Sequence, residues 1–177
     1  MKVFLTFLAL VIVNVNAMIF HDDLRACRGL QNLLNTAAEN CAQGAAMYFD
    51  REDYAEGYLS FDEDEILDCM EHVRQSCLEK AGSQRILQLR MQVYLYNDSG
   101  NCIVLEDGAP VKEYSFSFPL TLKADPRAGR TEEVILTEPS VEVQVYAQIE
   151  DPFRQPFVRM EQLAADCIYS NQPQSGV

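Results

Sequence analysis

The spacing of apolar residues along the chain changes once, near residue 82. From about residue 21 to 81 the apolar side chains recur every three or four positions, which is the period of an amphipathic helix. From about residue 84 to 163 they alternate with polar ones and are rich in Val, Ile, Tyr and Phe, which indicates strands with one buried face. The sequence therefore predicts an α+β fold with its helices first and its strands second.

Two helices are predicted in the first region. One extends from about Asp22 to Met47, and its inner face carries Leu24, Cys27, Leu30, Leu34, Ala37, Cys41 and Ala45. The other is expected to begin at a capping box, in which Ser60 and Glu63 satisfy each other's backbone donors. It should end at Gly82, because glycine readily adopts the left-handed conformation that often follows a helix.

Turn residues divide the second region into short strands. Residues 97–101 and 107–110 are rich in Asn, Asp, Gly and Pro, which favour turns. Strict alternation indicates a strand over residues 114–118 and another over residues 141–147. Several short strands separated by turns are typical of an antiparallel β-sandwich.

The first residues have the features of a secretory signal peptide. Lys2 precedes an apolar stretch, residues 3–13, and Val15 and Ala17 stand at the two selective positions of a cleavage site. The apolar stretch is shorter than the roughly 20 residues that span a bilayer, which disfavours the alternative of a membrane anchor. We expect a secreted, extracellular chain that begins near Met18 and has no membrane span.

These patterns divide the chain into four parts. Residues 1–17 are expected to form the signal peptide, 18–82 a helical hairpin region, 83–170 a β-sandwich domain and 171–177 a flexible tail. The expected fold class is thus a disulfide-linked helical hairpin followed by an antiparallel β-sandwich.

Six cysteines remain after cleavage, namely Cys27, Cys41, Cys69, Cys77, Cys102 and Cys167. An even number in an exported chain indicates three disulfide bonds, although spacing leaves the connectivity open. We favour Cys27–Cys77 and Cys41–Cys69. Cys27 and Cys41 lie about 21 Å apart along a straight helix but Cys69 and Cys77 only about 12 Å, so both bonds require the first helix to bend or end before Cys41. Cys102–Cys167 would then tie the first expected β-hairpin, residues 85–96 and 102–105, to the end of the strand region.

The charge balance narrows the range of partners. Lys and Arg number 14 and Asp and Glu 27, which gives a net charge of −13, and loss of Lys2 makes the mature chain more acidic still. Such a surface repels phosphate backbones, so nucleic acid is a poor partner, whereas it suits a calcium-rich fluid, cationic partners or simple solubility. Residues 50–71 are especially acidic, but an EF-hand register with Gly57 in sixth place has Glu52 first and Tyr54 third, against the pattern. We predict no metal site and no cofactor.

The sequence carries few residues typical of catalysis. Its two histidines, His21 and His72, stand near no nucleophile signature, so we predict no catalytic residue and no enzyme activity. Asn97-Asp98-Ser99 is a sequon in a turn that should be exposed, which makes Asn97 a glycosylation candidate. The stretch from Arg127 to Arg130 fits either a basic processing site in an exposed loop or two scattered arginines.

Short motifs in the second half resemble those of the C-terminal half of a zona pellucida-type module. They are the valine-rich stretch 141–147, Asp151-Pro152, and residues 166–170 with Pro173. The resemblance covers about residues 85–173 and implies an immunoglobulin-like β-sandwich in an extracellular coat or matrix. It does not extend to filament formation, because the first half of this chain is helical where such modules are β-rich.

The first hypothesis for function is a secreted, non-enzymatic structural or interaction component of a coat or matrix, with an extracellular protein partner. The alternative is a secreted, toxin-like venom or effector protein that acts on a receptor or channel, which three disulfides and a short signal peptide also fit. The third hypothesis is a hydrolase with an unrecognised site. Loss of turnover on mutation of His72 would support it.

Overall fold

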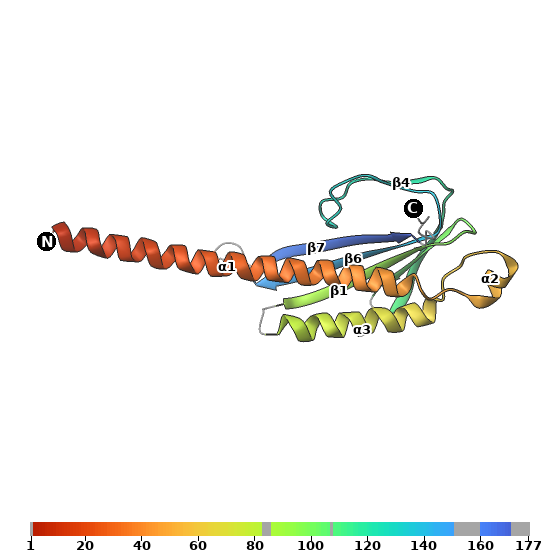
Figure 1. The fold of residues 1–177 in the computed structure, drawn as a ribbon, viewed down its shortest axis with the longest axis horizontal. Coiled ribbons are helices and arrows are strands. Elements are labelled where there is room, and N and C mark those ends of the chain that lie inside the picture. Colours follow the sequence, from red (N-terminus) through yellow and green to blue (C-terminus); the bar gives the residue numbers. More distant parts are fainter. Residues whose placement is uncertain (1, 83–85, 107, 151–159, 171–177) are drawn as a thin grey trace, which may run out of the picture.

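The computed structural model describes residues 2–82, 86–106, 108–150 and 160–170. The elements follow in the order α1 (Lys2–Ala45), α2 (Arg51–Glu56), α3 (Glu63–Ala81), β1 (Ile86–Tyr96), β2 (Asn101–Glu106), β3 (Ala109–Ser115), β4 (Leu120–Leu122), β5 (Val134–Leu136), β6 (Ser140–Glu150) and β7 (Met160–Ser170). The predicted α+β class, with helices before strands, is confirmed (Figure 1).

The strands form two separate sheets. The large sheet is antiparallel and five-stranded with the order β3-β2-β1-β6-β7, and the small one pairs β4 with β5. Helices α1 and α3 lie side by side along one face of the large sheet, and the β4–β5 ribbon lies on the other side (Figure 1). The fold therefore has a helical layer, a large sheet and a partial third layer.

Alternation along β6 separates the two faces of the large sheet. Val141, Val143 and Val145 are fully buried and pack in the core that contains the helices. Glu142 and Gln144, between them, point to the opposite face because side chains alternate along a strand. We call this opposite face, which the β4–β5 ribbon partly covers, the outer face.

Small residues let α1 lie close to its neighbours. Its buried positions include Leu34, Ala38, Cys41, Ala42 and Ala45, which bears out much of the predicted stripe. At Gly44 a Cβ atom would stand 2.8 Å from Sγ of Cys69 on α3, so any other residue would force that thiol or the helix to shift. The close approach of α1 and α3 therefore favours glycine at this position.

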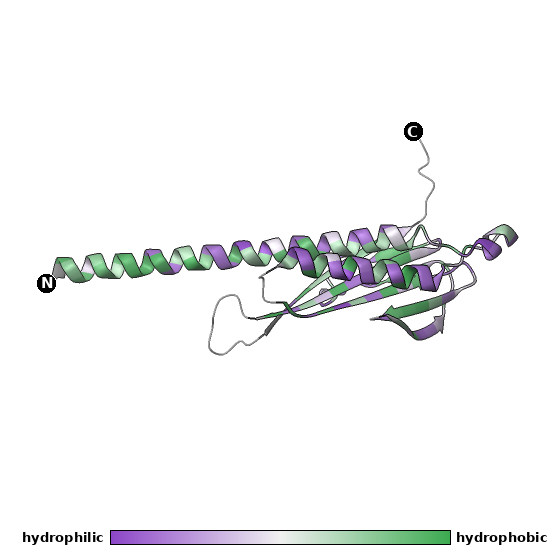
Figure 2. Ribbon diagram, turned by 90° about the horizontal axis from the view of Figure 1, so that it is seen from below, coloured by the Kyte–Doolittle hydropathy of each residue, from purple (hydrophilic) through white to green (hydrophobic). Residues whose placement is uncertain are grey.

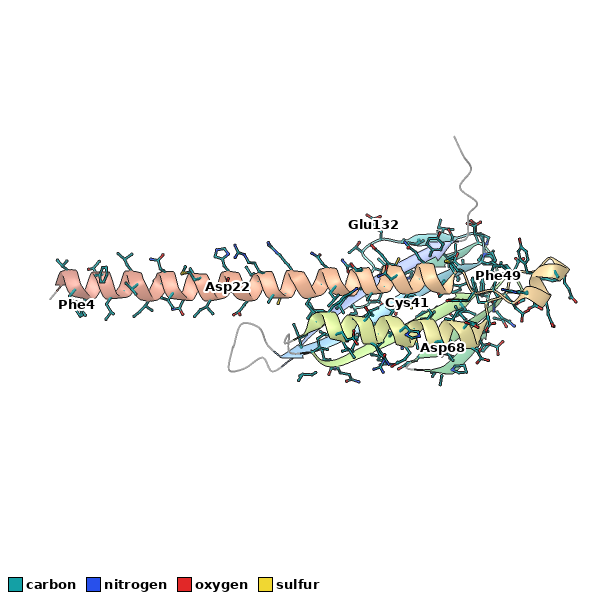
Figure 3. The ribbon with its side chains drawn as sticks, turned by 60° about the horizontal axis from the view of Figure 1, so that its bottom comes forward. Phe4, Asp22, Cys41, Phe49, Asp68 and Glu132 are labelled. Carbon is teal, nitrogen blue, oxygen red and sulfur yellow. The ribbon has the colours of Figure 1, made fainter. Side chains whose placement is uncertain are left out.

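The N-terminal half of α1 projects beyond the rest of the molecule (Figures 1 and 2). The side chains of Phe4 and Asp22 leave the helix where no other element lies beside it (Figure 3). By length and composition the helix could cross a membrane, and a signal sequence near the N-terminus has the same properties. The most apolar window of the helix is 0% buried. The expected start of the helix near Asp22 is wrong, because α1 continues back to Lys2.

Acidic side chains, rather than a serine, start the two shorter helices. Asp62 is the N-cap of α3 and accepts a hydrogen bond from the backbone N–H of Glu65 at 3.2 Å. Ser60 instead donates to the Asp53 carboxylate, so the predicted capping box is wrong. Asp50 caps α2 in the same way as Asp62 caps α3.

One hydrophobic core joins the helices to the sheet. Its buried residues come from both sides of the predicted boundary at residues 82–83, from α1 and α3 as well as from β1, β2, β6 and β7. The helices therefore occupy the place that a second full sheet would take in a sandwich. The immunoglobulin-like arrangement is not confirmed, and the expected flexible tail, residues 171–177, lies outside the described residues.

Candidate functional site

Two acidic side chains on the outer face share one arginine. Arg130, between β4 and β5, places Nη1 2.8 Å from Oε1 of Glu142 on β6 and 3.4 Å from Oδ2 of Asp166 on β7. The three side chains are 12%, 2% and 1% exposed, in that order. Two carboxylates and one guanidinium thus lie almost out of contact with water, a group that we call the Arg130 cluster.

A tight loop brings Arg130 into this position. The backbone N–H groups of Asp125 and Arg130 each donate to the other residue's carbonyl, at 2.9 and 3.0 Å. Gly129, with φ of +97°, presses against β7, where a Cβ atom would stand 3.0 Å from the carbonyl oxygen of Ala164. The Arg130 Nε then donates to the Lys123 carbonyl at 3.0 Å. Only glycine combines this backbone conformation with so close an approach.

Glu142 is well supplied with hydrogen bonds. The hydroxyl of Tyr96 donates to its Oε2 at 2.8 Å, and the Gln144 side-chain amide and Arg130 both donate to Oε1. The hydroxyl of Tyr146 extends this series of hydrogen bonds by donating to Oε1 of Gln144 at 2.7 Å. This network fixes Glu142 and holds the arginine toward it.

Asp166 is the unsatisfied member of the cluster. Neither of its carboxylate oxygens has a hydrogen-bond partner in the part of the chain that the structure describes, although both are buried. Burial, and next the charge of Glu142, raise the pKa of Asp166 to about 7, while Arg130 only partly opposes this and Asp125 adds to it. A buried acceptor without a donor is costly, so Asp166 is the least well compensated member of the cluster.

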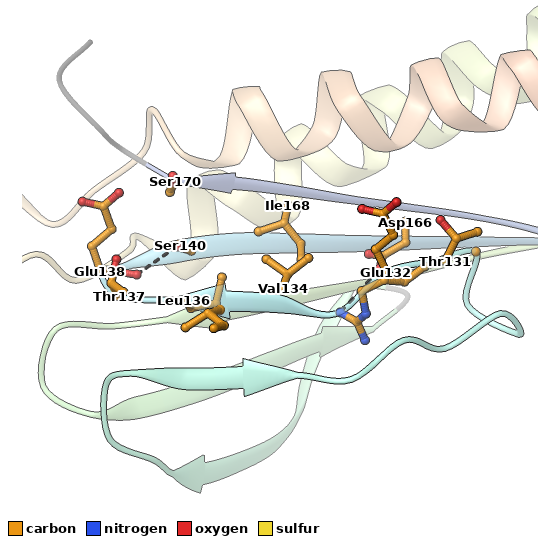
Figure 4. A pocket seen from close by; sticks show the side chains of 13 residues that line it. Thr131, Glu132, Val134, Leu136, Thr137, Glu138, Ser140, Asp166, Ile168 and Ser170 are labelled. Atoms are coloured by element: carbon orange, nitrogen blue, oxygen red, sulfur yellow. Dashed lines mark hydrogen bonds and ion pairs between the residues drawn. The ribbon is translucent and has the colours of Figure 1, made fainter. Parts of the chain in front are cut away.

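A groove of ≈ 470 Å³ runs past Asp166 (Figure 4). One wall is nearly continuous in sequence and comprises Gly129, Arg130, Thr131, Glu132, Val134, Ile135, Leu136, Thr137 and Glu138. Residues of β7 contribute only at alternate positions, as Asp166, Ile168 and Ser170. An unbroken run indicates that the backbone edge of β5 borders the groove, whereas alternate residues indicate that the outer face of β7 forms its floor.

A second hollow on the outer face has a different character. It measures ≈ 220 Å³ and is lined by Gln88, Arg90, Gln92, Tyr146, Gln148 and Gln162. Gln92 and Arg90 already bind Glu106, and Tyr146 binds Gln144, so much of its polarity is used internally. It is therefore a weaker candidate than the groove beside Asp166.

Among the predicted disulfides, the structure brings only Cys41 and Cys69 together. The Cys41 thiol hydrogen-bonds to the Cys69 sulfur, which lowers the pKa of Cys69 to about 7 and raises that of Cys41. No disulfide bond is present among the six cysteines, all of which lie in the described residues. The Cys41–Cys69 bond itself stays a prediction.

The other two predicted pairs are kept apart. Cys77 faces the stretch from Leu33 to Asn40 of α1, about 9 Å or more beyond Cys27 along the helix. Cys102 on β2 and Cys167 on β7 are three strand spacings apart, roughly 14 Å, because β1 and β6 lie between them. They also point to opposite faces, since Cys102 packs under the β4–β5 ribbon and Cys167 against the helix-side core. Both pairs exceed disulfide reach, so these two predictions are wrong for this fold.

Asn97 is not the exposed turn residue that the sequence suggested. It is 4% exposed, and its side-chain oxygen accepts a hydrogen bond from the backbone N–H of Phe61 at 3.2 Å. The segment before α3 therefore covers the turn, and Asp98 donates to Leu59 there as well. Glycosylation at Asn97 stays a prediction without its expected exposure.

The histidines and the acidic stretch lie away from the groove. His72 lines a hollow of ≈ 170 Å³ between α1 and α3, on the far side of the sheet, and His21 lies on the projecting part of α1. Within the described ranges, no group of three or more His, Cys, Asp and Glu side chains is arranged to hold a metal ion. Asp50 and Asp62 act as helix caps instead.

Comparison with known proteins adds no relative from which a function could be carried over. No protein-family model, no curated protein and no solved structure matches this chain.

Proposed function

We propose that this chain is an exported, non-enzymatic interaction protein that binds an extracellular protein partner in the groove between β5 and β7. The observation that carries the proposal is that Asp166, a residue that lines that groove, has a buried carboxylate with no hydrogen-bond partner among the described residues. Arg130 reaches Asp166 only at ion-pair distance, 3.4 Å, so a donor from a partner would supply the hydrogen bond that this carboxylate lacks.

Export is supported by the way the apolar leader lies outside the fold. The most apolar window of α1 contributes nothing to the core, whereas burial along the helix begins at Leu30. Cleavage after Ala17 would thus remove exposed apolar surface and leave every buried contact of α1 in place. Large exposed apolar surfaces are rare on mature soluble proteins, which favours removal.

A non-enzymatic role is supported by the chemistry of the groove. Its described lining residues carry carboxylates, hydroxyls, aliphatic side chains and one arginine, but none is a histidine or cysteine. The arginine is held by Glu142 and Asp166 rather than directed at a substrate. Such a surface can recognise a partner but offers no paired nucleophile and base.

The coat or matrix setting rests on the zona pellucida-type resemblance of residues 85–173, and we keep it as the preferred context. The toxin-like alternative uses the same groove against a receptor or channel. Accumulation in an insoluble extracellular layer supports the first context, and accumulation in a soluble secretion supports the second.

Expression of the full chain in a secreting eukaryotic cell tests export. We expect the protein in the medium with Met18 as its first residue, as determined by intact mass and N-terminal sequencing. The matched variant Ala17→Arg removes the small residue that cleavage requires, and it should stay uncut and cell-associated. Wild-type protein that stays cell-bound with its leader attached would contradict the proposal.

A further inference from the structure

The β4–β5 ribbon is an incomplete sheet. Its pairing is limited to Leu120 with Leu136, Thr121 with Ile135 and Leu122 with Val134. In the described part of the chain, no strand pairs with the other edge of β5. Two-stranded ribbons are marginally stable on their own, and a third strand adds both hydrogen bonds and packing.

The open edge of β5 faces the groove. Residues 134, 135 and 136 all line it, although Leu136 packs inward with Tyr96 while Ile135 is 60% exposed. Residues from both faces of one strand can border the same hollow only if the backbone edge of the strand also borders it. The vacant place beside β5 therefore lies directly above the outer face of β7.

The floor under this place has the period of a strand. Asp166, Ile168 and Ser170 stand at every second residue of β7, about 6.6 Å apart. One face of an added extended segment has the same repeat, so its side chains can match the three floor residues one by one. The matching chemistry is a cation at Asp166, an aliphatic side chain at Ile168 and a small polar one at Ser170.

The charge of the groove selects the cation. Glu132, Glu138 and Asp166 line it, and Arg130, the one basic residue among its described lining residues, is already bound to Glu142 at 2.8 Å and to Asp166 at 3.4 Å. A lysine or arginine entering the groove would come beside Asp166, whose carboxylate oxygens accept no hydrogen bond from the described residues and share only the 3.4 Å ion pair with Arg130. Charge-assisted hydrogen bonds of this kind are the stronger class.

We infer that the groove receives an extended, cationic segment of the partner, which pairs with the open edge of β5 and places a Lys or Arg side chain on Asp166. This inference rests on the proposed function and specifies how the partner is recognised. It joins two modes of recognition, strand addition for affinity and a buried carboxylate for selectivity.

Labelled peptides test the inference on the mature full-length protein. The probe is fluorescein-Thr-Arg-Thr-Val-Thr-Ser-Thr, together with the same residues in reverse order, because the added strand can run in either direction. Fluorescence anisotropy should show saturable binding of one order, weakened about tenfold when Gln replaces the Arg of the peptide. Asp166→Asn should cause a similar loss with the Arg peptide and little with the Gln peptide.

Two controls separate this site from general attraction to an acidic protein. Glu79→Gln makes the same charge change on an exposed residue of α3, on the other side of the sheet, and should leave binding unchanged. Peptides N-methylated at the even or at the odd positions separate the two edges of the bound strand. Only the set whose amides face β5 should lose binding, because the opposite edge makes no ladder.

The outcomes are decisive in both directions. Equal weakening by Asp166→Asn and Glu79→Gln, equal binding of both N-methylated sets, or no saturable binding of either peptide order would overturn the inference. None of these results bears on export, which the position of the mature N-terminus tests separately.

Discussion

Replacement of Arg130 by glutamine removes the one cation shared by two buried carboxylates. Glu142 and Asp166 are 2% and 1% exposed, so loss of the guanidinium leaves two carboxylates that are almost out of contact with water. Breaking a buried ion pair by removing one partner costs about 3–5 kcal/mol. Glu142 keeps its hydrogen bonds from Tyr96 and Gln144, which places the expected loss near the lower end, at about 3 kcal/mol.

Urea denaturation of the mature protein measures this loss. With a slope of about 2 kcal/mol per molar urea, a loss of about 3 kcal/mol lowers the unfolding midpoint by about 1.5 M with the slope unchanged. The loss should be smaller at pH 5 than at pH 8, because the pKa of Asp166, raised to about 7 by burial and Glu142, leaves it neutral at the lower pH.

Arg127→Gln is the matched control in the same loop. Arg127 is exposed and takes part through its backbone N–H, which donates to Asp125, so its side chain should be dispensable to within about 0.5 kcal/mol. A loss from Arg130→Gln below about 1 kcal/mol at pH 8, or one no larger than that of the control, would refute the reasoning.

Three further predictions concern the same fold. Asp166→Asn should gain stability relative to the wild type as pH rises from about 4 to 7 and then stay level, because the raised pKa of Asp166 lets the folded wild type hold a proton that the unfolded chain releases. In urea titrations, a stability advantage of the variant that shrinks over this range, or no change at all, contradicts this. Gly44→Ala should lower stability by about 1–3 kcal/mol, since its Cβ would stand 2.8 Å from Sγ of Cys69, whereas the higher helix propensity of alanine alone would raise stability. Peptide mapping of the secreted protein without reduction should recover a Cys41–Cys69 bond, and recovery of Cys102 bound to Cys167 would show that the strand order is wrong.

Local patterns predicted the elements that make the helix-side core. The three-to-four spacing placed Leu34 and Cys41 on one face, and the alternation of residues 141–147 placed the valines on one side of a strand. These features depend on neighbours within one or two turns of the chain. They can therefore be inferred from a single sequence.

The Arg130 cluster could not be predicted in the same way. Alternation puts Glu142 on the face opposite the buried valines, but only the position of the β4–β5 ribbon decides whether that face is exposed to solvent or buried. Composition indicated an exposed loop around Arg130, whereas its partners lie 12 and 36 residues further along the chain. A charged residue in a strand gives a weak signal, because most such residues are solvated.

The misplaced cysteines and Asn97 have a similar cause. The pairing of Cys102 with Cys167, which remained after the other two, requires β2 to lie near β7, but β1 and β6 lie between them. The turn at Asn97 looked exposed because the segment from Leu59 to Phe61, which covers it, is distant in sequence. Both errors concern contacts between segments that are remote along the chain.

Amide hydrogen exchange on the mature protein, with and without the arginine peptide, tests the central claim most directly. The account predicts slower exchange in residues 131–138 when the peptide is bound, with little change in α3, because the peptide pairs with the open edge of β5 on the outer face. Slower exchange confined to the helices, or unchanged exchange in residues 131–138 at saturating peptide, would contradict it.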